Sequence, residues 1–138
     1  MSTSGSATQF AEYRGRMQPD LSDAAVGFHE ADRLYTGVYS HPEWYGHGEP
    51  KVDRETVAQM HAARGNPDAQ VTIHRAVPPG VEEINPGDWV STSRSYAQQH
   101  GMHPTDSSKD WPVLSRVVPA RTVREGSGNS MHEWGYQP

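Results

Sequence analysis

The chain has no cysteine among its 138 residues, which excludes a disulfide framework and any thiolate that could bind a metal or act as a nucleophile. Long apolar runs are also missing, so we expect no membrane-spanning segment. The first residues lack the basic and then apolar pattern of a secretory signal peptide. Lysine and arginine number 12 against 17 aspartates and glutamates, which argues against a broad basic surface and leaves only a local groove for nucleic acid.

Hydrophobic residues are scarce as well, at 33%, while there are 13 glycines and 11 prolines. The 4 tryptophans and 6 tyrosines nevertheless supply large side chains for a core, so the composition indicates a loop-rich but folded protein. A chain of this length is typical of one domain. We therefore expect a flexible tail over residues 1–9, followed by a single domain over residues 10–138.

The first half of the chain has most of the helical spacing. Residues 10–30 have a weak helical periodicity, and residues 34–50 are an aromatic stretch interrupted by glycine and proline, which predicts a loop. Residues 56–64 place apolar side chains at helical intervals, with Asp53 before them as the predicted cap. The sequence Gly65-Asn66-Pro67 is typical of a helix stop, so this segment is predicted to be a helix.

Strand-like patterns follow that stop. Five segments are rich in β-branched or aromatic residues and are bounded by turn signals: 69–77, 88–93, 111–118, 122–124 and 131–136. One short helix is predicted between them, capped by Ser93 and ended by Gly101. Because helices come first and strands later, the order predicts an α+β domain with a largely antiparallel sheet.

Three of the predicted strands carry a polar residue on the same side as an apolar one. Alternation places Arg75 with Val71 and Ile73. It also places Ser91 and Ser93 with Trp89, and Glu133 with Met131. An inward-facing polar group costs several kcal/mol, on the order of 2–7, unless it is paired or lines a cleft. Since three strands share this feature, we expect the three polar groups to line one cleft.

Three motifs in this order resemble those of mono-ADP-ribosyltransferases. They are "HRAVP" at 74–78, "WVSTS" at 89–93 followed by a short helix, and "GNSMHEWGY" at 128–136. More narrowly, they are similar to the small ADP-ribosyltransferase-like domains found in phage and mobile-element proteins. The resemblance covers roughly residues 34–138 and depends on the combination of the motifs. It implies an ADP-ribosyltransferase-like fold, with N-terminal helices and loops before a split, mostly antiparallel sheet around an NAD cleft.

The family pattern is an arginine on an early strand, a Ser-Thr-Ser strand and a late strand with a catalytic glutamate. It matches Arg75, Ser91-Thr92-Ser93 and Glu133 of this chain. The resemblance implies that NAD is cleaved between nicotinamide and ribose and that ADP-ribose passes to an acceptor. Glu133 would stabilise the positive charge that builds on the ribose, as in glycoside hydrolysis.

In the same scheme Arg75 would bind the pyrophosphate or ribose, because its planar fork binds oxyanions in a bidentate manner. The serines of the Ser-Thr-Ser strand would orient the glutamate and brace the nicotinamide side of NAD. His74 and Tyr96 join Ser91, Thr92 and Ser93 as candidate NAD contacts. Tyr96 could instead belong to the core. His74 and His132 are expected on the opposite faces of their strands, in a structural or rim position.

Each of these roles has a structural alternative. Arg75 could be one half of an internal ion pair, Ser93 could simply be a helix cap, and Glu133 could be a solvated carboxylate.

No HExxH motif occurs among the histidines, and we expect no metal. The expected partners are NAD as co-substrate and a macromolecular acceptor, protein or nucleic acid, for a monomeric protein that does not associate with membranes. We expect a cytoplasmic location, in a bacterial host if the domain derives from phage.

One position departs from the family pattern. Many relatives have Glu or Gln two residues before the catalytic glutamate, where it helps to select the acceptor, and this chain has Met131. Methionine cannot bind an arginine strongly, which argues against arginine-directed transfer. The alternatives are therefore an NAD glycohydrolase, with water as acceptor, and a catalytically silent binding or inhibitor module. The acidic balance argues against the RNA 2′-phosphotransferase branch of the same fold.

Overall fold

The structure is a computed structural model and describes residues 25–126 and 130–138. The predicted tail over residues 1–9 lies outside this part, as does most of the weakly helical stretch 10–30. The described helices are η1 (Phe28–Arg33), η2 (Pro42–Trp44), α2 (Pro50–Ala63), α3 (Arg94–His100), η3 (Ser107–Lys109) and η4 (Ala120–Thr122), where η marks a 3₁₀ turn. The described strands are β1 (Gln70–Ala76), β2 (Trp89–Val90), β3 (Val113–Pro119), β4 (Val123–Glu125) and β5 (Trp134–Tyr136).

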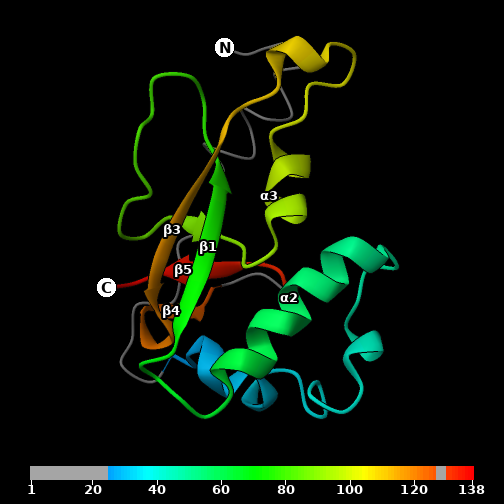
Figure 1. Cartoon of the computed structure of the whole chain (residues 1–138), viewed down its shortest axis with the longest axis vertical. Coiled ribbons are helices and arrows are strands. Elements are labelled where there is room, and N and C mark those ends of the chain that lie inside the picture. The colour runs from blue at the N-terminus through cyan, green and yellow to red at the C-terminus, as the bar shows by residue number, and fades with distance from the viewer. Residues whose placement is uncertain (1–24, 127–129) are drawn as a thin grey trace.

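Two antiparallel sheets form the centre of the described fold. One pairs β1 with β3, and the other has the order β2-β5-β4. An isolated bridge between His74 and Ser91 connects them. In Figure 1, β1 and β3 run side by side while β5 crosses them in projection, and α2 and α3 lie on one side of the β1–β3 pair. The prediction of an α+β protein with antiparallel sheets is confirmed.

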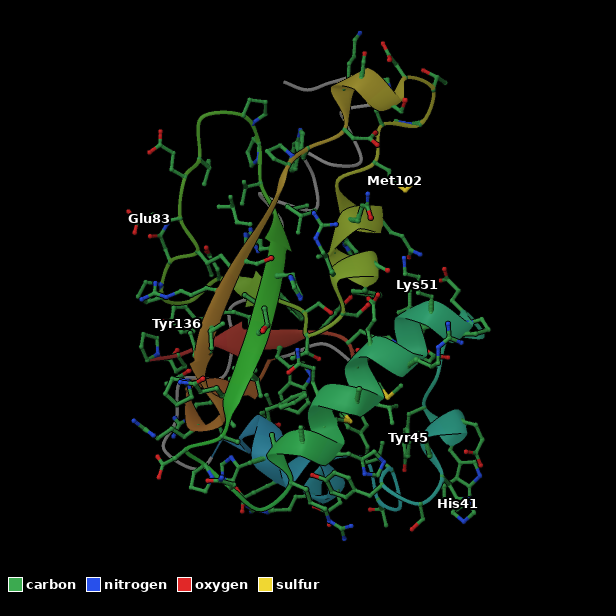
Figure 2. The ribbon with its side chains drawn as sticks, viewed as in Figure 1. His41, Tyr45, Lys51, Glu83, Met102 and Tyr136 are labelled. Carbon is green, nitrogen blue, oxygen red and sulfur yellow. The ribbon has the colours of Figure 1, made fainter. Side chains whose placement is uncertain are left out.

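The loop between β1 and β2 lies on the opposite side of the β1–β3 pair from the two helices. Figure 2 shows this arrangement, with Glu83 on that loop and with Lys51 and Met102 on the helical side. Within the described part of the chain, no helix has the length and apolar character needed to cross a membrane.

Helix α2 begins earlier than the sequence pattern predicted. Pro50 occupies its first turn, where a missing N–H has no cost, and Glu49 is the residue before it. Asp53 therefore lies inside the first turn, and its prediction as the cap was wrong. The predicted stop is confirmed, because Gly65 follows the C-cap residue Arg64 and has a φ of 72°, which favours glycine.

Helix α3 forms where it was predicted. The Ser93 side chain caps it by accepting a hydrogen bond from the Tyr96 backbone N–H at 3.0 Å. Gly101 ends the helix, and a Cβ at this position would approach the Ala76 Cβ to 2.8 Å. Glycine is therefore required there by the close packing of the helix end against β1.

The C-terminal strand is shorter than predicted. It begins at Trp134, so Met131 and Glu133 precede it in a turn, in which the Glu133 N–H donates to the Ser130 carbonyl at 3.1 Å. The fully buried Trp134 side chain donates from Nε1 to the Met131 carbonyl at 2.8 Å and contacts Phe28 edge-on at 5.0 Å. This aromatic packing holds the turn and Glu133 against the core.

Candidate functional site

The site is centred on a hydrogen bond between Tyr96 and Glu133. The Tyr96 hydroxyl, at the end of a side chain on α3, donates to Oε2 of Glu133, in the turn before β5. Tyr96 is buried and Glu133 is half-buried, so the carboxylate is held in place but still reaches the surface. This contact joins the last of the three sequence motifs to the helix that follows the second.

The Ser-Thr-Ser segment leads into the same contact. The Ser93 N–H donates to Oγ of Ser91 at 3.0 Å, and Oγ of Ser93 in turn accepts from the Tyr96 N–H. Ser93 also donates its hydroxyl proton to Oε1 of Glu55 at 2.9 Å. A serine hydroxyl has one proton, so Ser93 has no donor left for a substrate. The hydroxyl proton of Ser91 has no acceptor among the described residues, and the residue is only 3% exposed.

His74 lies on the same face as Ser91. The two residues exchange both backbone hydrogen bonds, at 2.7 and 2.9 Å, which aligns them across neighbouring strands. The last pair of β2 and β5 joins Val90 to Trp134, the residues next to Ser91 and Glu133. His74 and Ser91 thus lie side by side, and Glu133 directly precedes the residue that pairs with Val90.

The imidazole of His74 is held neutral. Its Nδ1 is 2.7 Å from the Ser115 hydroxyl, while burial and then the charge of Arg94 lower its pKa. Its Nε2 has no hydrogen-bond partner among the described residues. The side chain can therefore offer one uncharged ring nitrogen to a ligand on the face that carries Ser91.

Arg75 is not brought to this group. It shares the other face of β1 with the buried Val71 and Ile73 and is itself only 7% exposed. Its guanidinium donates to the Trp89 carbonyl at 2.7 Å and forms an ion pair with Asp88 at 3.8 Å. This arrangement corresponds to the internal ion pair, the structural alternative for Arg75.

Thr92 lies in a bend between β2 and α3. The residue is 1% exposed, and its Oγ1 has no hydrogen-bond partner within the described residues. Of the six predicted NAD contacts, the structure thus joins Tyr96 directly to Glu133, links Ser93 to the Tyr96 backbone, and pairs His74 with Ser91 on the neighbouring segment. Arg75 lies on the reverse face of β1, and Thr92 is buried in the bend before α3.

His132, next to Glu133, is fully buried between two side chains of α2. Its Nδ1 is 2.6 Å from Oγ1 of Thr56, and its Nε2 is 3.0 Å from Oδ1 of Asp53. Burial lowers its pKa, as does the nearby His47, while Asp53 opposes the shift. The ring is therefore neutral. Because a carboxylate only accepts, Nε2 carries the proton toward Asp53, and Nδ1 accepts from the Thr56 hydroxyl.

This hydroxyl, imidazole and carboxylate do not form a nucleophilic triad. Thr56 is 0% exposed within α2, so no substrate can reach its hydroxyl. Sequence reasoning missed both Asp53 and Thr56 as neighbours of the candidate glutamate. A signal was available for Thr56, because it occupies an apolar position in the helical repeat with Val52, Met60 and Ala63.

The aromatic loop supplies the outer edge of the site. The exposed His47 has Nε2 3.1 Å from the Ser130 hydroxyl, and its ring contacts those of His132 and Tyr96 at 4.7 and 5.7 Å. Tyr35, from the same loop, has its pKa raised to about 12 by burial and then by the negative charges of Glu133 and Glu125. Tyr35 is therefore neutral and adds no charge beside the carboxylate.

The described residues contain no group of three or more His, Cys, Asp or Glu side chains placed to hold a metal ion. Gly128 and Asn129 of the C-terminal motif lie outside these residues. No family model, curated protein or solved structure matches this chain.

Proposed function

We propose that this protein is an NAD-dependent mono-ADP-ribosyltransferase that cleaves the nicotinamide–ribose bond and transfers ADP-ribose to a macromolecular acceptor. The hydrogen bond from Tyr96 to Glu133 carries the proposal, because it joins the Ser-Thr-Ser segment with its helix to the C-terminal motif. In this proposal the two antiparallel sheets correspond to the halves of the split sheet in the ADP-ribosyltransferase-like fold.

Glu133 is the proposed catalytic residue. Loss of nicotinamide leaves an oxocarbenium-like ribose, and a carboxylate beside the sugar stabilises its positive charge. Such stabilisation requires a charge that is already oriented before the reaction. The Tyr96 hydroxyl supports this requirement by binding one carboxylate oxygen from the buried side of the site. The other oxygen remains for a ribose hydroxyl or for the developing cation.

NAD would contact the face that carries His74 and Ser91. Ser91 has a free hydroxyl proton and His74 a free ring nitrogen, and both suit hydroxyl or amide groups of the dinucleotide. Arg75 takes a positioning role in this proposal. By binding the Trp89 carbonyl and Asp88, it fixes the backbone just before the Ser-Thr-Ser segment.

The burial of Met131 supports a second candidate function. The side chain is 0% exposed and lies in the hydrophobic core. Many members of the family that this chain resembles use this position to select the acceptor. Met131 is buried and therefore cannot contact an acceptor. This observation favours an NAD glycohydrolase, in which water takes the place of the macromolecular acceptor.

Incubation of the protein and a cell lysate with NAD labelled on the adenosine side tests the proposal. We expect nicotinamide release together with label in the protein, DNA or RNA fraction. Release without label in any fraction would support the glycohydrolase instead. Absence of nicotinamide release would contradict both activities and leave the silent binding module.

Glu133→Gln is the decisive variant. We expect it to keep the fold and NAD binding and to lower nicotinamide release by about 10²-fold or more, the usual effect of deleting a transition-state electrostatic contact. Glu43→Gln is the matched control, since Glu43 is an exposed carboxylate that pairs with His41 on the aromatic loop. Equal turnover by Glu133→Gln and Glu43→Gln would refute the assignment of Glu133.

A further inference from the structure

Glu55 of α2 binds the start of α3 with both of its oxygens. Oε1 accepts from the Ser93 hydroxyl and the Ser95 N–H, each at 2.9 Å, and Oε2 accepts from the Ser95 hydroxyl at 3.0 Å. The donors come from residues 38 and 40 positions away in the sequence. A single carboxylate thus connects the two helices at the segment that carries the Ser-Thr-Ser motif.

The contact continues to the proposed catalytic carboxylate. Ser93 donates to Glu55 and accepts from the Tyr96 N–H, so its orientation is determined on both sides. The Tyr96 side chain then donates to Glu133. The connection from Glu55 to Glu133 therefore runs through the Ser93 hydroxyl to the Tyr96 backbone, and then along the covalent side chain of Tyr96 to its hydroxyl.

The charge of Glu55 matches these donors. Burial alone would raise its pKa, but the hydrogen bonds from Ser95 and Ser93 and the charge of Lys51 together lower it. The side chain is therefore an ionised acceptor for all three bonds. Charge-assisted hydrogen bonds of this kind are stronger and more directional than neutral ones.

We propose that Glu55 is a positioning residue that sets the orientation of Tyr96, and through it of Glu133, for the reaction proposed above. It does not touch the substrate. The proposal rests on the proposed function for its kinetic consequence, whereas the orientation of Tyr96 can be measured without NAD. Loss of Glu55 frees the first turn of α3, and small displacements at a reacting group are costly to the rate.

The test compares Glu55→Ala with Glu55→Gln and with Glu49→Ala. Glu49 provides a matched control, because it also connects the helices, accepting from the Gln99 side chain at 2.6 Å, but does not bind the Ser-Thr-Ser segment. We expect Glu55→Ala to lower kcat for nicotinamide release about 10-fold or more, with KM for NAD changed less than about twofold. Glu55→Gln keeps one carbonyl acceptor, so we expect its kcat to recover most of the value lost in Glu55→Ala. We expect Glu49→Ala to keep the kcat of the wild type.

The second readout is the NMR signal of Tyr96 in protein with ring-labelled tyrosine, assigned with Tyr96→Phe. We expect this signal to shift in Glu55→Ala and to stay in place in Glu49→Ala. A shifted signal with no nicotinamide release from the wild-type protein would support positioning and refute the proposed function. An unshifted signal, or equal kcat in Glu55→Ala and Glu49→Ala, would refute the role of Glu55.

Discussion

Asp53 on α2 accepts a hydrogen bond from Nε2 of the buried His132 at 3.0 Å, and the same oxygen accepts from the His47 N–H at 3.1 Å. One carboxylate oxygen thus holds both the loop before α2 and the turn before β5. Because Glu133 follows His132 directly, this contact fixes the position of the candidate catalytic carboxylate relative to α2.

The neutral histidines predict a loss of stability in mild acid. The pKa of His132 and that of His74 are both lowered in the folded state, in each case chiefly by burial. The unfolded chain therefore binds protons first as the pH falls below about 6.5, and the free energy of unfolding decreases until the folded pKa is passed. Urea unfolding at about pH 7.5 and about pH 5.5 measures this change.

His132→Gln is the matched variant for that measurement, because glutamine does not titrate in this range. We expect its free energy of unfolding to be lower than that of the wild type at the higher pH and to depend less on pH. A wild-type protein that is as stable at the lower pH as at the higher one would contradict the assignment of neutral, buried rings.

Gly46→Ala should disturb the site through Asp53. A Cβ at Gly46 would collide with the Asp53 carboxylate, which would have to leave its bonds to His47 and His132. We expect a loss of about 1–3 kcal/mol in the free energy of unfolding, as for other overpacked sites, and reduced nicotinamide release.

Gly126→Ala is the control for this substitution. There the added Cβ would meet the Trp89 ring at 3.5 Å, an ordinary van der Waals distance. Thermal unfolding of the two variants should therefore separate them. Similar melting temperatures would show that Asp53 can move without cost.

Arg75→Met should act on stability before it acts on NAD binding. The variant removes the ion-pair partner of Asp88, a residue that is itself buried. Removing one side of a buried pair typically costs about 3–5 kcal/mol, because a buried charge loses its compensation. Asp88→Asn in the same chain should recover part of that loss, which denaturant unfolding can quantify.

Calorimetry with NAD separates the two interpretations of Arg75. In a positioning role, the Arg75→Met, Asp88→Asn double variant keeps an NAD affinity within a few fold of the wild type once it is folded. A folded double variant that no longer binds NAD would show instead that the guanidinium contacts the dinucleotide, as the resemblance to the family implies.

Tyr96→Phe removes only the hydroxyl that binds Glu133. The ring contacts with His132 and His100, at 5.1 and 4.6 Å, can remain. A hydrogen bond to a charged group contributes about 1.5–3 kcal/mol, and part of this is recovered by water because Glu133 is only half-buried. We therefore expect a small drop in stability and a fall in nicotinamide release of about 10-fold, measured at saturating NAD. Unchanged release would mean that Glu133 does not need this donor.

Local patterns predicted much of the fold. The alternation of residues 69–77 marked β1, and Ser93 and Gly101 marked the limits of α3, because strand pleating and helix capping depend on near neighbours in the sequence. The C-terminal strand was predicted too long, since Met131 fits the alternation of a strand but lies in a turn, where its carbonyl accepts from the Trp134 side chain.

Sequence alone determined that Arg75 would share a face with Val71 and Ile73, because that follows from the two-residue period of a strand. Which face of β1 would meet Ser91 and Glu133 was decided only by the tertiary structure. The answer depends on the register between β1 and the Ser-Thr-Ser segment, in which His74 pairs with Ser91. The partners Glu55 and Asp53 come from α2, far from the motifs in sequence, and a local pattern has no information about such contacts.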